Sequence, residues 1–178
     1  MELLNLLKKA TIEILKFDNH PCIKLDENVK IQYLNALALI TNADGNICPK
    51  EIEYLKVFID SFGLSQDMLD IFIEFGKSPD EKTMLKMMQT LNTKDIKYNL
   101  LVDCMMMAYR DENYCDDECA MINQYFTMFK IGDCEVADLE DIFDIFYTQD
   151  KSALDKYYGD VDIELFDYLI EYYQLNND

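Results

Sequence analysis

Residues 34–51 have the sequence LNALALITNADGNICPKE. The first part, up to Ile40, is apolar on nearly every side of a helix, which is typical of a helix buried on all faces. The Asp-Gly pair at 44–45 favours a tight turn. Cys48 and Glu51, separated by proline and lysine, then match the N-cap and N3 positions of a following helix. This segment therefore predicts a buried helix, a turn and a second helix.

The rest of the chain carries similar signals. Proline and glycine occur where helices are expected to start or stop, and no segment shows sustained period-two alternation of apolar and polar residues. We therefore expect an all-α fold without a sheet. Ser78 is expected to cap one helix, with Pro79 at N1, and Thr93 to cap the next. Helices are expected over about residues 1–17, 26–42, 49–62, 65–76, 79–91, 93–110, 116–129 and 161–175, with one after Asp133 and a short one ending at Gly159.

Two parts of the chain resemble each other. Residues 34–62 align with 101–129 at an offset of 67, each as an apolar helix, a polar turn and a second helix. In the two turns, 44–51 and 111–118, Asp, Asn, Cys and Glu recur at the same places. The chain is therefore expected to be a multi-helix bundle built from two pseudo-repeated helix-turn-helix units, at about residues 30–76 and 96–145.

Each turn offers two carboxylates, Asp44 and Glu51 in the first and Asp111 and Glu118 in the second. Their spacing resembles half of a calcium loop, but the other half is missing. Because calcium takes about six or more oxygen ligands, either each turn binds a cation weakly with the help of waters, or the two turns meet and share one. Helix capping and the helix dipole explain the same residues without any metal.

The turn at 43–51, together with the apolar helix before it and the Phe-Gly-Leu at 62–64, resembles the TerB-like family of tellurite-resistance proteins. That family also includes the N-terminal domain of a membrane-anchored DnaJ-like co-chaperone, and the resemblance covers roughly residues 30–145. It implies an all-helical domain of pseudo-repeated units. It also implies a divalent-cation site at the acidic turn residues, Asp44, Glu51, Asp111 and Glu118.

This chain departs from the family pattern in two ways. Glu112 replaces the glycine of the second turn, which costs turn geometry because glycine takes positive φ freely. Cysteine replaces the usual Ser or Thr cap in both turns, and a thiol is a weak acceptor. A bound cation is expected to be calcium, magnesium or manganese rather than zinc, because the cysteines lack the spacing of a zinc site.

Composition separates the chain into parts of different charge. The formal net charge is −19, and residues 99–178 contribute −16 of it. Such a charge repels phosphate backbones, so we expect no nucleic-acid partner. The expected organisation is an N-terminal amphipathic helix and loop at 1–25, the TerB-like domain at 26–147, and an acidic, tyrosine-rich helical extension at 148–178.

The chemistry of the chain favours a protein that is not an enzyme. His20 is the only histidine, so serine or cysteine nucleophiles have only one candidate base. No secretory signal is recognised in the sequence, so the six cysteines are expected to be reduced thiols. No stretch is apolar enough to span a membrane, and the chain is expected to be cytoplasmic. The N-terminal helix either docks on the core or contacts a membrane surface.

These observations predict a stress-response or adaptor module that binds a protein with a basic surface. The surface expected to bind it is the acidic C-terminal half, with Asp138, Asp141, Asp162 and Glu164 as candidate contacts. The alternative is an acidic inhibitor or immunity protein that masks the basic surface of a toxin or nuclease. The adaptor hypothesis needs the turn residues, whereas the inhibitor hypothesis needs the acids of the C-terminal half.

Overall fold

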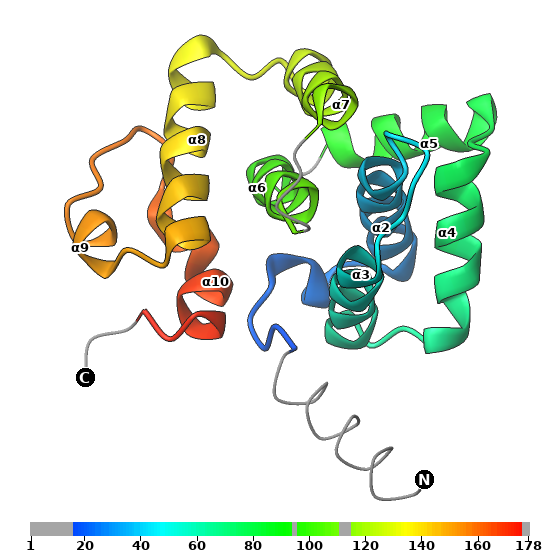
Figure 1. Ribbon diagram of the computed structural model, residues 1–178, viewed down its shortest axis with the longest axis horizontal. Helices are drawn as coiled ribbons and strands as arrows, with labels where there is room; N and C mark the ends of the chain where they lie inside the picture. The colour runs from blue at the N-terminus through cyan, green and yellow to red at the C-terminus, as the bar shows by residue number, and fades with distance from the viewer. Residues whose placement is uncertain (1–15, 94–95, 111–114, 176–178) are drawn as a thin grey trace, which may run out of the picture.

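The computed structural model describes residues 16–93, 96–110 and 115–175, and all regular secondary structure within these ranges is helical. The expected all-α class is therefore confirmed. The amphipathic helix expected over residues 1–17 lies almost entirely outside the described residues. Figure 1 shows the chain as helices of different lengths around a central pair, α2 and α6. In chain order the elements are the 3₁₀ helix η1 (Pro21–Lys24), α2 (Glu27–Thr41), α3 (Pro49–Ser61), η2 (Gln66–Met68), α4 (Leu69–Lys77), α5 (Glu81–Asn92), α6 (Lys97–Ala108), α7 (Asp116–Met128), α8 (Asp133–Thr148), α9 (Lys151–Leu154), η3 (Ile163–Phe166) and α10 (Asp167–Tyr172).

The helix α2 is the centre of the fold, as its apolar sequence predicts. It packs against α3, α4, α5, α6 and α7, and all its residues from Gln32 to Thr41 are buried. The helix α6 is also buried along most of its length and packs against α8 on its other side. A helix with neighbours on all sides needs apolar residues on all sides, which explains the absence of a polar face in both sequences.

The close contact between α2 and α4 depends on a glycine. A Cβ built on Gly76 would overlap the backbone carbonyl of Ala38, which is a fixed neighbour rather than a flexible side chain. The Asn42 side chain also donates a hydrogen bond to the Gly76 carbonyl, at 2.9 Å. Gly76, in the last turn of α4, therefore lets the two helices approach.

Two predicted helix starts are wrong. Ser78 follows the end of α4, and α5 begins only at Glu81, with Asp80 as its N-cap accepting a hydrogen bond from the Thr83 amide at 2.9 Å. The reason is local, since the carboxylate of Asp80 is as good a cap as a serine hydroxyl and accepts the Thr83 amide. Thr93 ends α5 instead of starting α6, and its hydroxyl donates to the Thr90 carbonyl.

The expected helix over residues 161–175 is divided into two shorter elements, η3 and α10. Asp162 caps η3 through the Glu164 amide, and the junction at Phe166 buries that ring completely. The periodicity of the sequence is helical throughout and does not distinguish the two elements. Phe166 and Tyr168, on either side of their junction, are both buried in the core.

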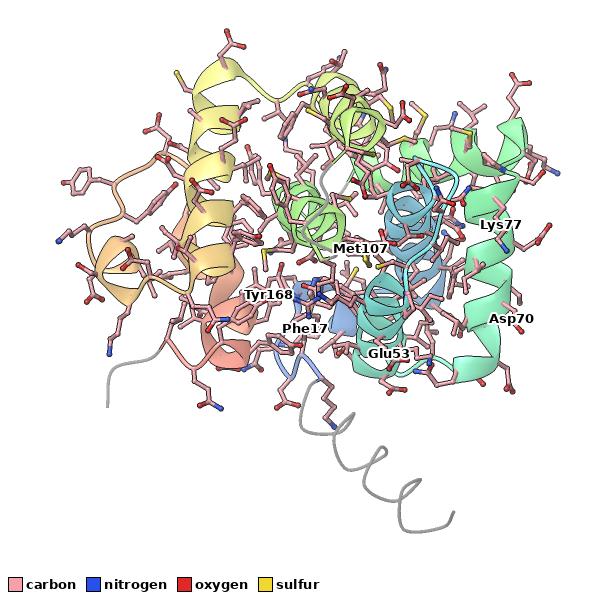
Figure 2. All side chains as sticks on the ribbon, in the orientation of Figure 1. Phe17, Glu53, Asp70, Lys77, Met107 and Tyr168 are labelled. Atoms are coloured by element: carbon pink, nitrogen blue, oxygen red, sulfur yellow. The ribbon has the colours of Figure 1, made fainter. Side chains whose placement is uncertain are left out.

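Segments from both ends of the chain join the core. Phe17 packs edge-on against Tyr168, with ring centroids 5.4 Å apart, and lies 4.9 Å from the ring of Phe58. Figure 2 labels Phe17 and Tyr168 in the interior, between α10 and α3. The division at residues 25 and 147 stays a prediction, while residues on both sides of it share this core.

Candidate functional site

The first acidic turn has the geometry that its sequence predicts. Gly45 has a φ of 81°, a backbone conformation that favours glycine. The side chain of Asp44 is exposed, and its Oδ1 accepts a hydrogen bond from the Asn46 amide at 2.7 Å. Asp44 therefore closes the turn through an Asx-type bond to the backbone.

The glutamate of this turn completes a reciprocal cap on α3. Glu51 Oε2 accepts from the Cys48 amide at 2.8 Å, and Cys48 Sγ accepts from the Glu51 amide at 3.4 Å. The Glu51 side chain is only 4% exposed. Burial raises the pKa of the Cys48 thiol, and the charge of Glu51 acts in the same direction, so Cys48 caps the helix as a neutral thiol.

The second turn repeats this arrangement at the offset of 67. Glu118 Oε2 accepts from the Cys115 amide at 3.0 Å, and Glu118 is 6% exposed. Asp111 lies outside the described residues. The helices after both turns also end alike, because the Leu64 amide binds the Ile59 carbonyl and the Ile131 amide binds the Phe126 carbonyl, both at 3.0 Å. The matched hydrogen bonds are consistent with the pseudo-repeat of two helix-turn-helix units. The repeat itself stays a prediction.

The metal prediction stays untested by this geometry. Over the described ranges, no three or more His, Cys, Asp or Glu side chains lie close enough to hold one metal ion together. In the first turn, Asp44 and Glu51 each use one oxygen to accept a backbone hydrogen bond. A cation at this turn would therefore need backbone carbonyls and waters as most of its ligands.

The four candidate partner-binding acids differ in their roles. Asp138 Oδ2 accepts from the amides of Asp160 and Val161, at 2.7 and 3.0 Å, so this side chain holds the segment before η3 against α8. Asp162 accepts from the Glu164 amide and caps η3. Asp141 and Glu164 are exposed. Two of the four acids therefore accept hydrogen bonds from the backbone, and the side chains of the other two are exposed to solvent.

An acidic groove of about 570 Å³ lies between α8 and α9. Tyr158 at its edge is fully exposed, whereas Tyr157 is half-buried. Burial raises the pKa of Tyr157 to about 12, and the charges of four aspartates add to this effect, those of Asp138 and Asp141 before those of Asp160 and Asp162. Negative charge therefore predominates among the residues that line the groove, with four aspartates and one lysine. Its polar and aromatic lining includes Asp138, Asp141, Asp144, Asp150, Lys156, Tyr157 and Tyr158.

The structure also contains a buried polar network that the sequence interpretation missed. His20 Nε2 lies 3.0 Å from Asp103 Oδ2, and the hydroxyls of Tyr33 and Tyr168 donate to the same carboxylate at 2.5 and 2.7 Å. All four side chains are at most 1% exposed. They come from the segment before η1, from α2, from α6 and from α10, so the network joins four distant parts of the chain.

The bonds of His20 assign its tautomer. Its Nδ1 accepts from the Cys22 amide at 3.0 Å, so the ring proton is on Nε2 and is donated to Asp103. Burial and the charge of Asp103 raise the pKa of both Tyr33 and Tyr168 well above the ordinary tyrosine value. The only histidine is therefore engaged in the interior and has no access to a substrate. One signal was visible in the sequence, the single acid at 103 within the apolar run LLVDCMMMA.

All six cysteines lie within the described residues and carry free thiols. Cys22 and Cys104 are buried, and burial raises the pKa of both thiols. Cys134 is exposed at the first turn of α8. A thiol that is protonated and buried is a poor nucleophile and a poor metal ligand.

The comparisons with known proteins agree with this architecture. The family described as tellurite resistance protein TerB matches residues 31–141, which is well over half of the chain. No curated protein and no solved structure matches the sequence. Within the described residues, no helix has the length and apolar character needed to cross a membrane. The predicted resemblance over residues 30–145 is thus confirmed, and the chain belongs to the TerB family of helical tellurite-resistance proteins.

Proposed function

We propose that this protein is a non-enzymatic adaptor of the TerB family that binds a basic segment of a partner protein in the acidic groove between α8 and α9. The observation that carries the proposal is the groove itself, which places four aspartates and two tyrosines around one hollow. Burial of the only histidine supports the non-enzymatic part, because it withdraws the commonest general base from solvent.

The aspartates of the groove divide between structure and recognition. Asp138 is occupied by two backbone amides. Asp141 and Asp144 are exposed on α8, and neither carboxylate is paired with another described residue in a hydrogen bond or an ion pair. Lys156, the basic residue of the groove, donates to the Ser152 hydroxyl at 3.0 Å. Asp141 and Asp144 are therefore the carboxylates that a partner's lysine or arginine meets first.

Tyr158 adds an aromatic contact to this charged surface. Its side chain is fully exposed next to the aspartates. Tyrosine is enriched at protein interfaces, and its ring attracts the cationic head of arginine or lysine. A basic segment lying along the groove would thus pair its charged groups with the carboxylates and pack one of its side chains against the ring of Tyr158.

A lysine octapeptide labelled with fluorescein tests this proposal. Its binding to the full-length protein is measured by fluorescence anisotropy at low and at physiological salt. We expect the pair Asp141→Asn and Asp144→Asn to weaken binding at low salt by about tenfold, because two close charges are lost. The matched control is Asp70→Asn with Glu74→Gln, which removes the same charge from the exposed surface of α4. An equal loss in both double variants would mean that only net charge is recognised, and the proposal would be wrong.

A divalent cation at the acidic turns is the second part of the proposed function. It is supported by the matched placement of Glu51 and Glu118 and by the exposed carboxylate of Asp44 beside a tight turn. With few protein ligands available, we expect weak binding of calcium, magnesium or manganese. Cation bound only to the folded state raises its stability by about 2.7 kcal/mol at a hundredfold excess over Kd.

Thermal unfolding of the metal-stripped protein tests this part. The variant Asp44→Asn with Glu51→Gln removes both charges but keeps an oxygen that can accept the Cys48 amide, so the cap on α3 is retained. We expect millimolar calcium or manganese to raise the Tm of the wild type by several degrees and not that of this variant. The Asp70→Asn, Glu74→Gln protein again controls for net charge. An equal shift in all three proteins would assign the cation effect to the general surface.

A further inference from the structure

Arg110 is the only arginine in the chain, and the other fifteen basic residues are lysines. It lies two residues after the end of α6 and is half-buried. Its guanidinium lies over the ring of Tyr54, with Cζ 4.0 Å from the ring centroid, and Nη1 donates to the Tyr173 hydroxyl at 3.5 Å. Unlike lysine, arginine presents a flat fork of N–H donors, which matches the geometry of a carboxylate.

Most donors of Arg110 have no hydrogen-bond partner among the described residues. Among the described residues no carboxylate lies within ion-pair distance of the guanidinium, although the chain contains 35 acidic residues. The Tyr54 ring and the carbonyl end of α6 compensate part of its charge, but neither uses the N–H groups in plane. A guanidinium has five N–H donors, and the single described hydrogen bond is long.

The guanidinium lines a pocket of about 350 Å³ with largely aromatic walls. These walls are formed by Tyr109, Phe146, Tyr147 and Tyr173, and Gln149 adds an amide at the edge. The rings support one another, since Tyr109 lies 5.4 Å from Tyr147 and Phe146 lies 6.4 Å from Tyr173, centroid to centroid. The pocket shares no residue with the acidic groove, although both use α8.

The residue beneath the guanidinium also has an unmet polar group. Tyr54 is 1% exposed, and among the described residues its hydroxyl is a buried group without a hydrogen-bond partner. Burial raises the pKa of Tyr54 well above the ordinary value, as do the nearby Tyr173 and Asp103, whereas Arg110 lowers it. A buried hydroxyl without a partner costs about 1–3 kcal/mol.

We propose that this pocket binds a small aromatic carboxylate. The carboxylate would pair with the guanidinium of Arg110 and accept from the Tyr173 hydroxyl, while the ring of the ligand packs among the aromatic walls. A planar guanidinium matches a carboxylate through two parallel hydrogen bonds. The volume lies in the range of small-molecule sites, which begins at about 300 Å³.

The charge of the protein selects among anions. A phosphate group carries close to two negative charges at neutral pH, and a single arginine on a protein of net charge −19 offers it little compensation. A monoanion with an apolar body meets less repulsion and gains from burying its ring. The pocket therefore favours a carboxylate with an aromatic body over a free phosphate.

Titrations with benzoate on the full-length protein test the proposal, with benzamide and inorganic phosphate as comparison ligands. Binding is followed by amide chemical shifts in ¹⁵N-labelled protein. We expect benzoate to shift the resonances of Tyr147, Gln149 and Tyr173, and benzamide and phosphate to leave them unchanged at equal concentration. Arg110→Lys keeps the charge but loses the fork, and it should weaken benzoate binding by about tenfold. Lys82→Gln, which removes a charge from exposed α5, should bind as the wild type does.

Three results would overturn the proposal. Equal shifts with benzamide would show that only the apolar walls bind, equal shifts with phosphate would show that only charge is recognised, and unchanged benzoate binding in Arg110→Lys would exclude the guanidinium. Circular dichroism of each variant checks its fold. If Arg110→Lys does not fold, Tyr173→Phe replaces it, because this change removes only the hydroxyl and should weaken benzoate binding by about threefold. Unchanged binding in Tyr173→Phe would then contradict the proposal.

Discussion

The Nε2 atom of His20 lies 3.0 Å from Oδ2 of Asp103, although 83 positions separate the two residues in the chain. The pair is completely buried, and two tyrosine hydroxyls complete the shell of the carboxylate. This contact ties the segment before η1 to α6 and, through Tyr168, to α10. One carboxylate therefore joins the segment before η1 and α10 to α6, which lies within the residues that match the TerB family.

Asp103→Asn is expected to destabilise the protein by about 3 kcal/mol, because the amide group would turn a donor toward the donors that now meet the carboxylate. Urea unfolding followed by circular dichroism gives the free energy of unfolding. The control Asp70→Asn changes an exposed carboxylate on α4 and should stay within about 0.5 kcal/mol of the wild type. A cost below about 1 kcal/mol for Asp103→Asn would show that the network contributes little.

Cys48→Ser is expected to stabilise the protein by about 0.5 kcal/mol. The thiol now accepts from the Glu51 amide at 3.4 Å, and a hydroxyl is a better acceptor that keeps the same position. Thermal and urea unfolding measure the gain. Cys134→Ser, at the exposed first turn of α8, is the matched control and should change little. Destabilisation by Cys48→Ser would mean that packing of the sulfur outweighs its capping role.

Gly76→Ala is expected to destabilise the protein by about 2 kcal/mol, opposite in sign to the gain of up to about 1 kcal/mol that this change brings in an open helix. The added methyl group would overlap the Ala38 carbonyl between α4 and α2. Gly132→Ala, where the nearest neighbour of an added Cβ is the Glu135 side chain at 3.5 Å, is the control and should cost less. A stabilised Gly76→Ala protein would contradict the close packing of the two helices.

Glu135→Gln is expected to reduce stability by about 1 kcal/mol at pH 7 and to have a smaller effect in acid. Glu135 accepts from the Tyr98 hydroxyl and from the Gly132 amide, and these bonds lower its pKa below the ordinary glutamate value. Because the folded pKa is the lower one, the stabilisation is complete above the unfolded pKa and is lost as pH falls through the folded pKa. Urea unfolding between pH 7 and pH 3 measures the difference. A difference that does not depend on pH would exclude the ionised carboxylate as its source.

Local features of the sequence were sufficient for most helices. The Asp-Gly turn and the cap on α3 depend on residues within four positions of each other, so the sequence contains the whole interaction. The apolar run of α2 marks a buried helix without naming its neighbours. Where two local signals compete, as at Ser78 and Asp80 before α5, the sequence interpretation chose the wrong one. The change from the 3₁₀ helix η3 to α10 at Phe166 is not visible in the periodicity, which is helical on both sides.

The candidate sites required the tertiary structure. Asp138 and Asp141 could be chosen from the acidity of their segment, but the groove forms only because residues 157–159 return to α8. Arg110 could be noticed as a unique arginine, but its aromatic walls come from α8 and from Tyr173 near the C-terminus.

The amino-acid sequence was enough to establish the family, the all-α class and the capping geometry of the first turn, since each depends on neighbours along the chain. The meeting of His20 with Asp103, the acidic groove and the pocket at Arg110 were decided only by packing. These contacts join residues 22 to 83 positions apart, and a linear pattern does not specify which of its polar side chains will lie together.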